Sequence, residues 1–355
     1  MSLSIAGMSW VTPLGSNVND VWQGLVAGEA APIEILENAQ NGARYLVRRV
    51  PPTATAHLPL HARLRRASAI SRFAAAAGLA ALAAAKTPPS LDRIALVFAI
   101  SNGGVIYTRR FYADIVKSGA QSASPLLFPE TVFNAPASHL AAILEISGAS
   151  YTVVGDGAVG ILALKLAEDL LASGDVDACL VVAAEEIDSL VCEAYRQWRF
   201  LRDPKKPETG RGMIMSEGAG AVLLKPSNGG IEIDQIVPGA NFFRRSEASA
   251  RLASVVSRLK NEIGFCVGSG NGTFIDRAER AAVGDEMPVY SPKIAIGESV
   301  GASVFWQLIT AAKALEAGTL PGSSKPPVGS RALVLACGLN QQTGGLTVCF
   351  SARSH

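Results

Sequence analysis

Short runs of apolar residues alternate along the chain with longer alanine-rich segments, a pattern typical of strands that alternate with helices. Residues 94–100 are apolar at every position, which predicts a central strand buried on both of its faces. Residues 63–85 are rich in alanine and predict one long helix. Because strands that are separated by helices usually pair in parallel, the pattern predicts an α/β fold whose sheet is covered on both sides.

The N-terminal residues follow the same alternation. Residues 2–7 predict a strand, and residues 21–26 predict a short amphipathic helix. Asn19 or Asp20 is expected to cap that helix, since a side-chain oxygen at this position accepts hydrogen bonds from the first free N–H groups.

Two segments share the pattern of a strand, a turn that contains glycine, and an apolar helix. The first spans residues 151–174 and the second spans residues 293–318. Each is followed by an apolar run, over residues 178–184 and 332–336, that predicts a buried strand. A unit that recurs in this way indicates that the chain contains two related halves.

The boundary between the halves is expected at residues 225–230, which are rich in turn-forming residues. Residues 231–236 then begin a strand, as the N-terminal residues do. We therefore expect a first half over residues 1–229 and a second half over residues 230–355.

Composition narrows the classes of function. At 355 residues and 49% apolar content, the chain is able to bury a large core. A net charge of +2 without a run of like charges gives no reason to expect a nucleic-acid partner. We expect neither a metal site nor a cofactor.

Five cysteines lie in apolar or strand-like surroundings without C-x-x-C spacing. Buried, reduced thiols are the simplest interpretation, and they favour the cytoplasm. The N-terminus has no basic residues before its apolar start, and no stretch approaches the roughly 18 apolar residues of a membrane span. We expect a soluble protein that is not secreted and has no membrane span.

Several short motifs occur along the chain in a fixed order. They are residues 11–16 with Trp22 and residues 25–28, then residues 71–73, residues 124–129, Asn134, His139, residues 217–220 and residues 270–273. Each motif alone is weak, but the ordered set covers nearly the whole chain. In this order the chain resembles the β-ketoacyl synthases, the decarboxylating condensing enzymes of fatty-acid and polyketide assembly. The resemblance implies a thiolase-like fold of two duplicated halves in five layers, α-β-α-β-α.

The chemistry of that family depends on three side chains. A cysteine at the start of a buried helix accepts the acyl chain, because the positive end of the helix dipole stabilises a thiolate. Two histidines then assist decarboxylation of the malonyl unit and stabilise the enolate oxygen. By resemblance, the cysteine position falls on Gly157 and the histidine positions fall on Ser269 and Glu298. We therefore expect no condensation by this chain alone.

Other parts of the family's site are also altered. The glycine-rich turn that binds the carbonyl group is replaced by residues 337–345, which puts an oxyanion hole there in doubt. The four histidines of the chain are His57, His61, His139 and His355, and none falls at a catalytic position. His139 is expected on a helix, in a structural role.

The polar residues near the lost positions have structural interpretations. Asp156 and Glu298 each precede a predicted helix, where a carboxylate is able to cap free N–H groups. Lys293 and Glu217 match residues that form polar supports around the family's site, and we expect the same of them here. Ser269 follows a strand-like run and is expected to be a turn residue.

Phe305 and Trp306 follow the second turn, where the family has very small residues. Their bulk is expected to fill space that a substrate would occupy. Together with Asp156, they are candidates for shaping a pocket.

In some polyketide systems of this family, one subunit of the dimer is an inactive homologue called the chain-length factor, and this chain resembles such a subunit. The expected partner is a ketosynthase homologue that retains the cysteine and both histidines. These subunits frequently have glutamine at the lost cysteine, so Gly157 leaves the subgroup open. By resemblance, Thr131, Val132 and Phe133 lie on the segment that approaches the partner's acyl pocket. Phe133 is the candidate for shaping that pocket, with plain core packing as the alternative.

Basic residues suggest a second partner. In the family, regions similar to the start of the long helix and to the loop near residue 205 contact the acidic acyl carrier protein. The carrier is therefore an expected partner, directly or through the partner subunit, although a solvated surface explains these residues equally well. The residues are Arg63, Arg65, Arg66, Arg202, Lys205, Lys206 and Arg211.

Two alternative functions remain open. One is an enzyme with altered acyl chemistry, such as a decarboxylase or a hydrolase that uses Asp156, Ser269 or Glu298. The other is a homodimeric scaffold that binds the acyl carrier without turnover.

Overall fold

The strands of the protein fall into one large sheet and one small sheet. In the computed structural model, which describes residues 1–87, 89–259, 262–323 and 329–351, the large sheet contains ten strands. The small sheet contains β2 (Glu34–Glu37), β3 (Arg44–Arg48) and β7 (Met215–Ser216). The strands of the large sheet are β1 (Leu3–Val11), β4 (Ile94–Ile100), β5 (Ser150–Val154), β6 (Ala178–Glu185), β8 (Gly218–Pro226), β9 (Gly230–Val237), β10 (Ile263–Val267), β11 (Val289–Tyr290), β12 (Arg331–Cys337) and β13 (Thr343–Ser351).

The large sheet consists of two runs of five strands that have the same arrangement. Its strand order is β11-β10-β12-β13-β9-β1-β8-β6-β4-β5. Counted outward from the middle of the sheet, β1, β8, β6, β4 and β5 of one run correspond to β9, β13, β12, β10 and β11 of the other. Among the described residues, the strands of the two runs pair with each other through a short stretch between β1 and β9, where Leu3 and Ser4 lie opposite Ile233 and Glu232.

The expectation that the strands pair in parallel is correct for part of the large sheet and wrong for the rest. β5, β4 and β6 are parallel to one another, as are β11, β10 and β12, but β8 and β13 run antiparallel to both of their neighbours. For β13 the reason is the short connection 338–342 from β12, because parallel neighbours need a crossover of about a dozen residues or more.

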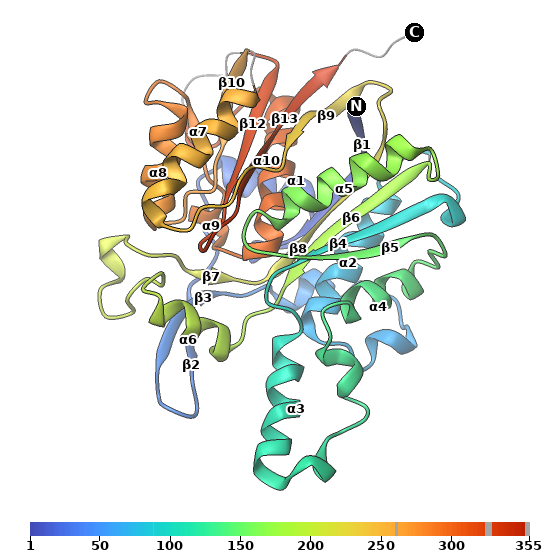
Figure 1. The fold of residues 1–355 in the computed structure, drawn as a ribbon, viewed down its shortest axis with the longest axis vertical. Coiled ribbons are helices and arrows are strands. Elements are labelled where there is room, and N and C mark those ends of the chain that lie inside the picture. The colour runs from blue at the N-terminus through green and yellow to red at the C-terminus, as the bar shows by residue number, and fades with distance from the viewer. Residues whose placement is uncertain (88, 260–261, 324–328, 352–355) are drawn as a thin grey trace.

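Six of the α-helices form three layers around the two runs of strands. The α-helices of the described residues are α1 (Val18–Val26), α2 (Ala69–Ala83), α3 (Val105–Ser118), α4 (Ala135–Ile143), α5 (Val159–Ser173), α6 (Ser189–Gln197), α7 (Ala248–Arg258), α8 (Phe274–Val283), α9 (Lys293–Ile296) and α10 (Ser303–Ala317). Helices α5 and α10 contact strands of both runs, α2 and α4 cover the first run, and α7 and α8 cover the second. The five layers implied by the family resemblance are therefore confirmed (Figure 1).

Strand β4 explains why its sequence is apolar at every position. Ala95, Val97 and Ala99 face the cluster that includes α5 and α10, whereas the alternate residues face the cluster under α2 and α4. The strand is thus buried on both faces, as predicted. Helix α3 and the segment after it project away from the layers (Figure 1).

Two predicted helix starts are wrong. The long helix begins at Ala69, because residues 62–64 form a separate turn in which His61 accepts the N–H of Arg63. Helix α1 begins at Val18. Asn17 caps this helix, because its side-chain oxygen accepts the N–H groups of Asn19 and Asp20. Asn19 and Asp20, the predicted caps, lie within that helix.

The second predicted strand-turn-helix unit is wrong at its first element. Lys293–Ile296 is the short helix α9, and the strand that corresponds to β5 in the sheet order is β11. The buried strands expected over residues 178–184 and 332–336 are confirmed as β6 and β12. The turn expected at residues 225–230 lies between β8 and β9, while the division into two domains stays a prediction.

The five cysteines are buried and form no disulfide, as predicted. Within the part of the chain that the structure describes, each helix is too short or too polar to cross a membrane.

Glu232 of β9 ties the two runs together at their junction. Its side chain is 3% exposed, and its carboxylate accepts hydrogen bonds from the N–H of Gly229 at 2.9 Å, the hydroxyl of Ser4 at 3.3 Å and the hydroxyl of Ser227. Burial by itself would raise the pKa of Glu232, but the hydrogen bonds outweigh burial and lower the pKa below its ordinary value.

We predict that Glu232→Gln lowers the free energy of unfolding at neutral pH by about 1–2 kcal/mol, because the hydrogen bonds lose a charged acceptor. A carboxylate with a lowered folded pKa stabilises the protein above its unfolded pKa, and this contribution is lost as the pH falls through the folded value. The difference between wild type and variant should therefore narrow below about pH 4, measured by urea unfolding. Glu34→Gln, at an exposed position of β2, is the matched control. Equal losses in the two variants at pH 7 would contradict the prediction.

Candidate functional site

The turn between β5 and α5 places Gly157 against the loop that follows β12. A Cβ atom at Gly157 would lie 3.2 Å from the Cα of Gly338 and 3.5 Å from the carbonyl oxygen of Cys337. The first contact is tighter than ordinary van der Waals packing and the second is ordinary, so a side chain at this position requires Gly338 to shift by a few tenths of an ångström.

Asp156 binds the same loop. Its carboxylate accepts the N–H groups of Leu339 at 3.2 Å, Asn340 at 2.8 Å and Gln341 at 3.1 Å. Its own N–H donates to the side-chain oxygen of Gln342 at 2.8 Å. The expectation that Asp156 caps α5 is wrong, because this loop approaches closely enough to supply three N–H donors, and α5 begins without a side-chain cap.

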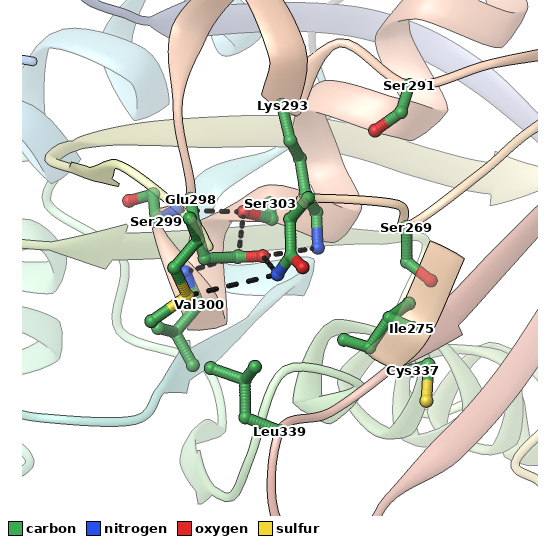
Figure 2. Close-up of polar contacts among 12 residues, drawn as sticks. Ser269, Ile275, Ser291, Lys293, Glu298, Ser299, Val300, Ser303, Cys337 and Leu339 are labelled. Carbon is green, nitrogen blue, oxygen red and sulfur yellow. Dashed lines mark hydrogen bonds and ion pairs between the residues drawn. The ribbon is translucent and has the colours of Figure 1, made fainter. Parts of the chain in front are cut away.

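Glu298 is the centre of a buried hydrogen-bond network (Figure 2). One oxygen accepts from Lys293 Nζ at 2.8 Å and from Asn271 Nδ2 at 2.7 Å. The other accepts from the N–H of Val300 at 2.9 Å and from the hydroxyl of Ser303 at 2.7 Å. The residue is 2% exposed. Each oxygen thus has two donors. One of these four donors, the N–H of Val300, lies at the start of a helical segment, where the sequence predicted that Glu298 acts as a cap.

Ser269 lies directly after β10 and is fully buried. Its N–H and its hydroxyl both donate to Glu279, at 2.6 Å and 3.0 Å. Burial raises the pKa of Glu279, and the hydrogen bonds from Ser269 oppose that shift. Figure 2 shows the hydroxyl of Ser269 pointing away from Glu298, so the two residues do not form one reactive group.

An apolar cluster encloses these groups. It includes Tyr195, Ile275, Val300, Cys337 and Leu339, all of them buried. Burial raises the pKa of the Tyr195 hydroxyl and of the Cys337 thiol, and nearby carboxylates raise both pKa values further. A thiol in such surroundings stays protonated and is a poor nucleophile.

Glu185 is a further buried carboxylate near this cluster. It accepts the N–H groups of Ser101 at 2.5 Å and Asn102 at 3.1 Å. Burial raises its pKa to about 8, although these hydrogen bonds act in the opposite direction. Its negative charge is one of the causes of the raised Tyr195 pKa, together with Asp156 and Glu298.

Phe305 and Trp306 are fully buried in the middle layer. A Cβ atom at Gly220 would lie 2.4 Å from the Cβ of Phe305, and one at Gly160 would lie 3.1 Å from its ring. Trp306 donates its Nε1–H to the carbonyl oxygen of Ala219 at 2.9 Å. Phe305 therefore packs between α5 and β8, whereas Trp306 packs in a separate cluster with Trp10 of β1 and Leu25 of α1. This chain covers both side chains completely.

The two residues expected to support the site lie in separate networks. Lys293 contacts Glu298, as described, whereas Glu217 accepts from Arg49 at 3.3 Å and from the N–H of Ile187 at 3.2 Å. Burial raises the pKa of Glu217, with the positive charge of Arg49 opposing. Their supporting role stays a prediction.

Thr131, Val132 and Phe133 lie outside the buried cluster. Val132 and Phe133 are 41% and 47% exposed, and the hydroxyl of Thr131 donates to the carbonyl oxygen of Phe128 at 2.8 Å. The segment is thus a surface feature that a partner is able to reach.

His139 lies on α4, as predicted, and its Nε2 contacts Glu130 at 2.7 Å. His355 is outside the described residues. No group of three or more histidine, cysteine or acidic residues is placed to hold a metal within residues 1–87, 89–259, 262–323 and 329–351.

Two surface cavities lie elsewhere. One, of about 510 Å³, is lined by residues that include Leu60, Arg65 and Arg72. The other, of about 280 Å³, is lined by residues that include Arg49 and Arg109. Neither is lined by Gly157, Ser269 or Glu298.

Sequence reasoning missed the partners that close the site. Asn271 lies in a motif that the sequence brought out, but nothing in that motif indicated a bond to Glu298. The amides of residues 339–341 leave no signal in the sequence, because every residue except proline has one. Their role depends on where the chain folds.

Comparisons with known proteins agree with this architecture. The family described as the β-ketoacyl synthase N-terminal domain matches residues 2–229. A 3-oxoacyl-[acyl-carrier-protein] synthase 2 from Vibrio harveyi is 22% identical over 235 residues, which cover 62% of this chain and 57% of that protein. The chain thus spans little more than half the length of this curated relative.

Two solved structures share the fold across nearly all of the chain. The ishigamide ketosynthase/chain length factor has a TM-score of 0.79 and 19% identity, covering 99% of this chain and 100% of that chain. A type II polyketide synthase acyl-carrier protein in complex with its ketosynthase bound to the hexaketide also has a TM-score of 0.79, with 15% identity over 98% and 99% of the two chains. With the family match over residues 2–229, these findings show that the chain belongs to the β-ketoacyl synthase family.

Proposed function

We propose that this chain is a non-catalytic subunit, of the chain-length-factor type, that pairs with an active β-ketoacyl synthase in polyketide or fatty-acid assembly. One observation carries the proposal. The three positions that hold cysteine and two histidines in the family hold Gly157, Ser269 and Glu298 here, and the fold closes around each of them. Without a cysteine or a histidine at these three positions, the site lacks the groups that the family uses for acyl transfer and decarboxylation.

The contacts disfavour a stand-alone enzyme with altered chemistry. A general base or nucleophile needs a free lone pair and access to a substrate. The carboxylate of Glu298 is held by four donors, that of Asp156 by three, and the hydroxyl of Ser269 is fully buried. Their hydrogen bonds instead support a stable interior.

An exposed apolar edge supports the pairing. β5 is the last strand of the large sheet and pairs only with β4 in the described chain. Its residues Tyr151 and Val154 are 44% and 49% exposed. An edge strand with exposed apolar side chains is a template for pairing with another chain. The proposed partner is a homologous ketosynthase, because dimerisation between related chains is what the family resemblance implies.

The acyl carrier protein is the second proposed partner, binding directly or through the ketosynthase. Arg65 and Arg72 line the larger cavity beside exposed Leu60, and their positive charge suits an acidic carrier protein. We place the complex in the cytoplasm, where the buried cysteines stay reduced. A homodimeric scaffold is the alternative function. Identification of the partner protein distinguishes it from the proposed heterodimer.

We predict that restoring the thiol does not restore activity. Gly157→Cys and Gly157→Ala should each lower the free energy of unfolding by about 1–3 kcal/mol, since both add the Cβ atom that crowds Gly338. The cysteine variant should form no acyl adduct by intact mass and release no carbon dioxide from a malonyl thioester. An adduct that forms and turns over on the purified variant would refute the proposal.

Val154→Lys should abolish pairing, because a charge on the edge strand opposes its burial against a second sheet. The tagged chain is expressed in its native cells, and the captured protein is identified by mass spectrometry. Wild type should capture a homologue that retains cysteine and both histidines, and the variant should capture at least tenfold less. Phe243→Lys, also at an exposed apolar position, is the control and should pair normally. Capture of only a second copy of this chain would favour the scaffold.

Phe133→Ala should alter the product of the complex without preventing its assembly. If the exposed ring of Phe133 limits the acyl pocket of the partner, its removal lengthens the main product, as measured by mass spectrometry of carrier-bound chains. Phe243→Ala should leave the product distribution unchanged. If the product distribution is unchanged in both variants, Phe133 does not limit the partner's acyl pocket. Its role is then only to pack against Gly103.

A further inference from the structure

Backbone amides converge on one point at the surface end of the buried site. The N–H groups of Leu339, Asn340 and Gln341 all donate to the carboxylate of Asp156. Three successive amides that point at one anion form a concave site for negative charge. In this protein the anion is a side chain from a distant part of the chain.

The loop holds its shape through contacts that do not involve the carboxylate. The N–H of Gly338 donates to the carbonyl oxygen of Gln342 at 2.7 Å, and the N–H of Phe242 donates to that of Gln341 at 2.8 Å. The side chain of Leu339 is buried in the apolar cluster around Tyr195. These anchors should keep the amides in place when the carboxylate is removed.

The site fits a carboxylate closely. A Cβ atom at Gly338 would lie 2.0 Å from one oxygen of Asp156, so only glycine at that position admits the anion. Asp156 itself is buried, whereas Asn340 and Gln341 are exposed. A small anion in solution therefore has a short path to the amides.

We propose that the loop 338–341 is a carboxylate-binding site that the protein's own Asp156 occupies. In its bound position the carboxylate takes up the donors next to Gly157, so no oxygen of a thioester is able to use them. The inference deepens the proposed non-catalytic function and rests on it for its biological meaning: Asp156 acts as a built-in ligand that keeps the site closed.

The test removes the carboxylate and returns it as a free molecule. Asp156→Ala removes three non-hydrogen atoms, which formate replaces, and Asp156→Gly also removes the Cβ atom, which the methyl group of acetate replaces. Each full-length variant is melted with sodium formate, sodium acetate or sodium chloride at equal ionic strength. Stabilisation by a bound anion rises with the logarithm of its concentration above the dissociation constant, and the unfolding constant changes by about tenfold at ten times that constant.

We predict that formate raises the melting temperature of Asp156→Ala, and that acetate raises that of Asp156→Gly, each more than chloride does. Wild type and the control variant Asp169→Ala, changed at an exposed residue of α5, should show no such selectivity. Carboxylates that stabilise the Asp156 variants no more than chloride would overturn the inference.

A second variant covers the case in which neither small residue folds. Asp156→Asn keeps the size of the side chain but weakens the acceptor, since hydrogen bonds to a charged group are roughly twice as strong as neutral ones. Hydrogen exchange at the amides of residues 339–341 should accelerate by about fivefold or more relative to wild type. Unchanged exchange would overturn the inference. Partner capture is measured separately, so failure of the anion site and failure of the proposed pairing are distinguishable.

Discussion

The close packing of α5 and α10 between the two strand runs is the constraint on which the rest of the structure depends. Phe305 of α10 fits against Gly160 and Gly220, positions where a Cβ atom would leave too little room. This contact sets the depth of both helices in the middle layer. Because Gly157 precedes α5 and Glu298 precedes α10, it also sets where the two degenerate turns lie. The site is thus a consequence of how the middle layer packs.

The polar side chains of Glu298 and Ser269 are hydrogen-bonded in the buried interior of the site. Glu298 has a buried lysine, an amide, a hydroxyl and a backbone N–H as donors, and Ser269 is committed to Glu279. Buried polar groups that are fully hydrogen-bonded stabilise one arrangement of the chain, whereas a catalytic group needs an unsatisfied position. Burial also raises the pKa of Glu185 to about 8, so this carboxyl binds its proton more tightly than an exposed one. Such a site is suited to structural specificity.

The closed interior contrasts with the open outer edge. β5 presents apolar side chains at the end of the sheet, and the segment with Val132 and Phe133 is exposed. Asp156 lies between these two environments, since it begins the turn after β5 and its carboxylate holds the loop after β12. A subunit that has lost its chemistry but kept its pairing surface would show this combination. The internal carboxylate gives the closed state a specific physical cause.

The sequence by itself determined the elements whose pattern is local or strongly apolar. Residues 94–100 predicted a strand buried on both faces, because burial on both faces requires apolar residues at successive positions. The five-layered fold was implied by the family that the ordered motifs resemble. By resemblance, the sequence also assigned Gly157, Ser269 and Glu298 to the family's reactive positions, and this assignment stays a prediction. The apolar pattern did not predict the direction of every strand. β13 runs antiparallel to β12 because the connection between them is short, and an apolar pattern does not reveal the length of a connection.

Only the tertiary structure decided what the polar residues do. Asp156 looked like a helix cap, yet it binds amides 183 to 185 residues away in the sequence. Phe305 and Trp306 looked like candidates for lining a pocket, yet the chain covers them completely. A hydrogen bond or a packing contact between distant segments depends on where the chain brings them, and backbone amides, which every residue except proline carries, give no sign in advance of which ones will meet.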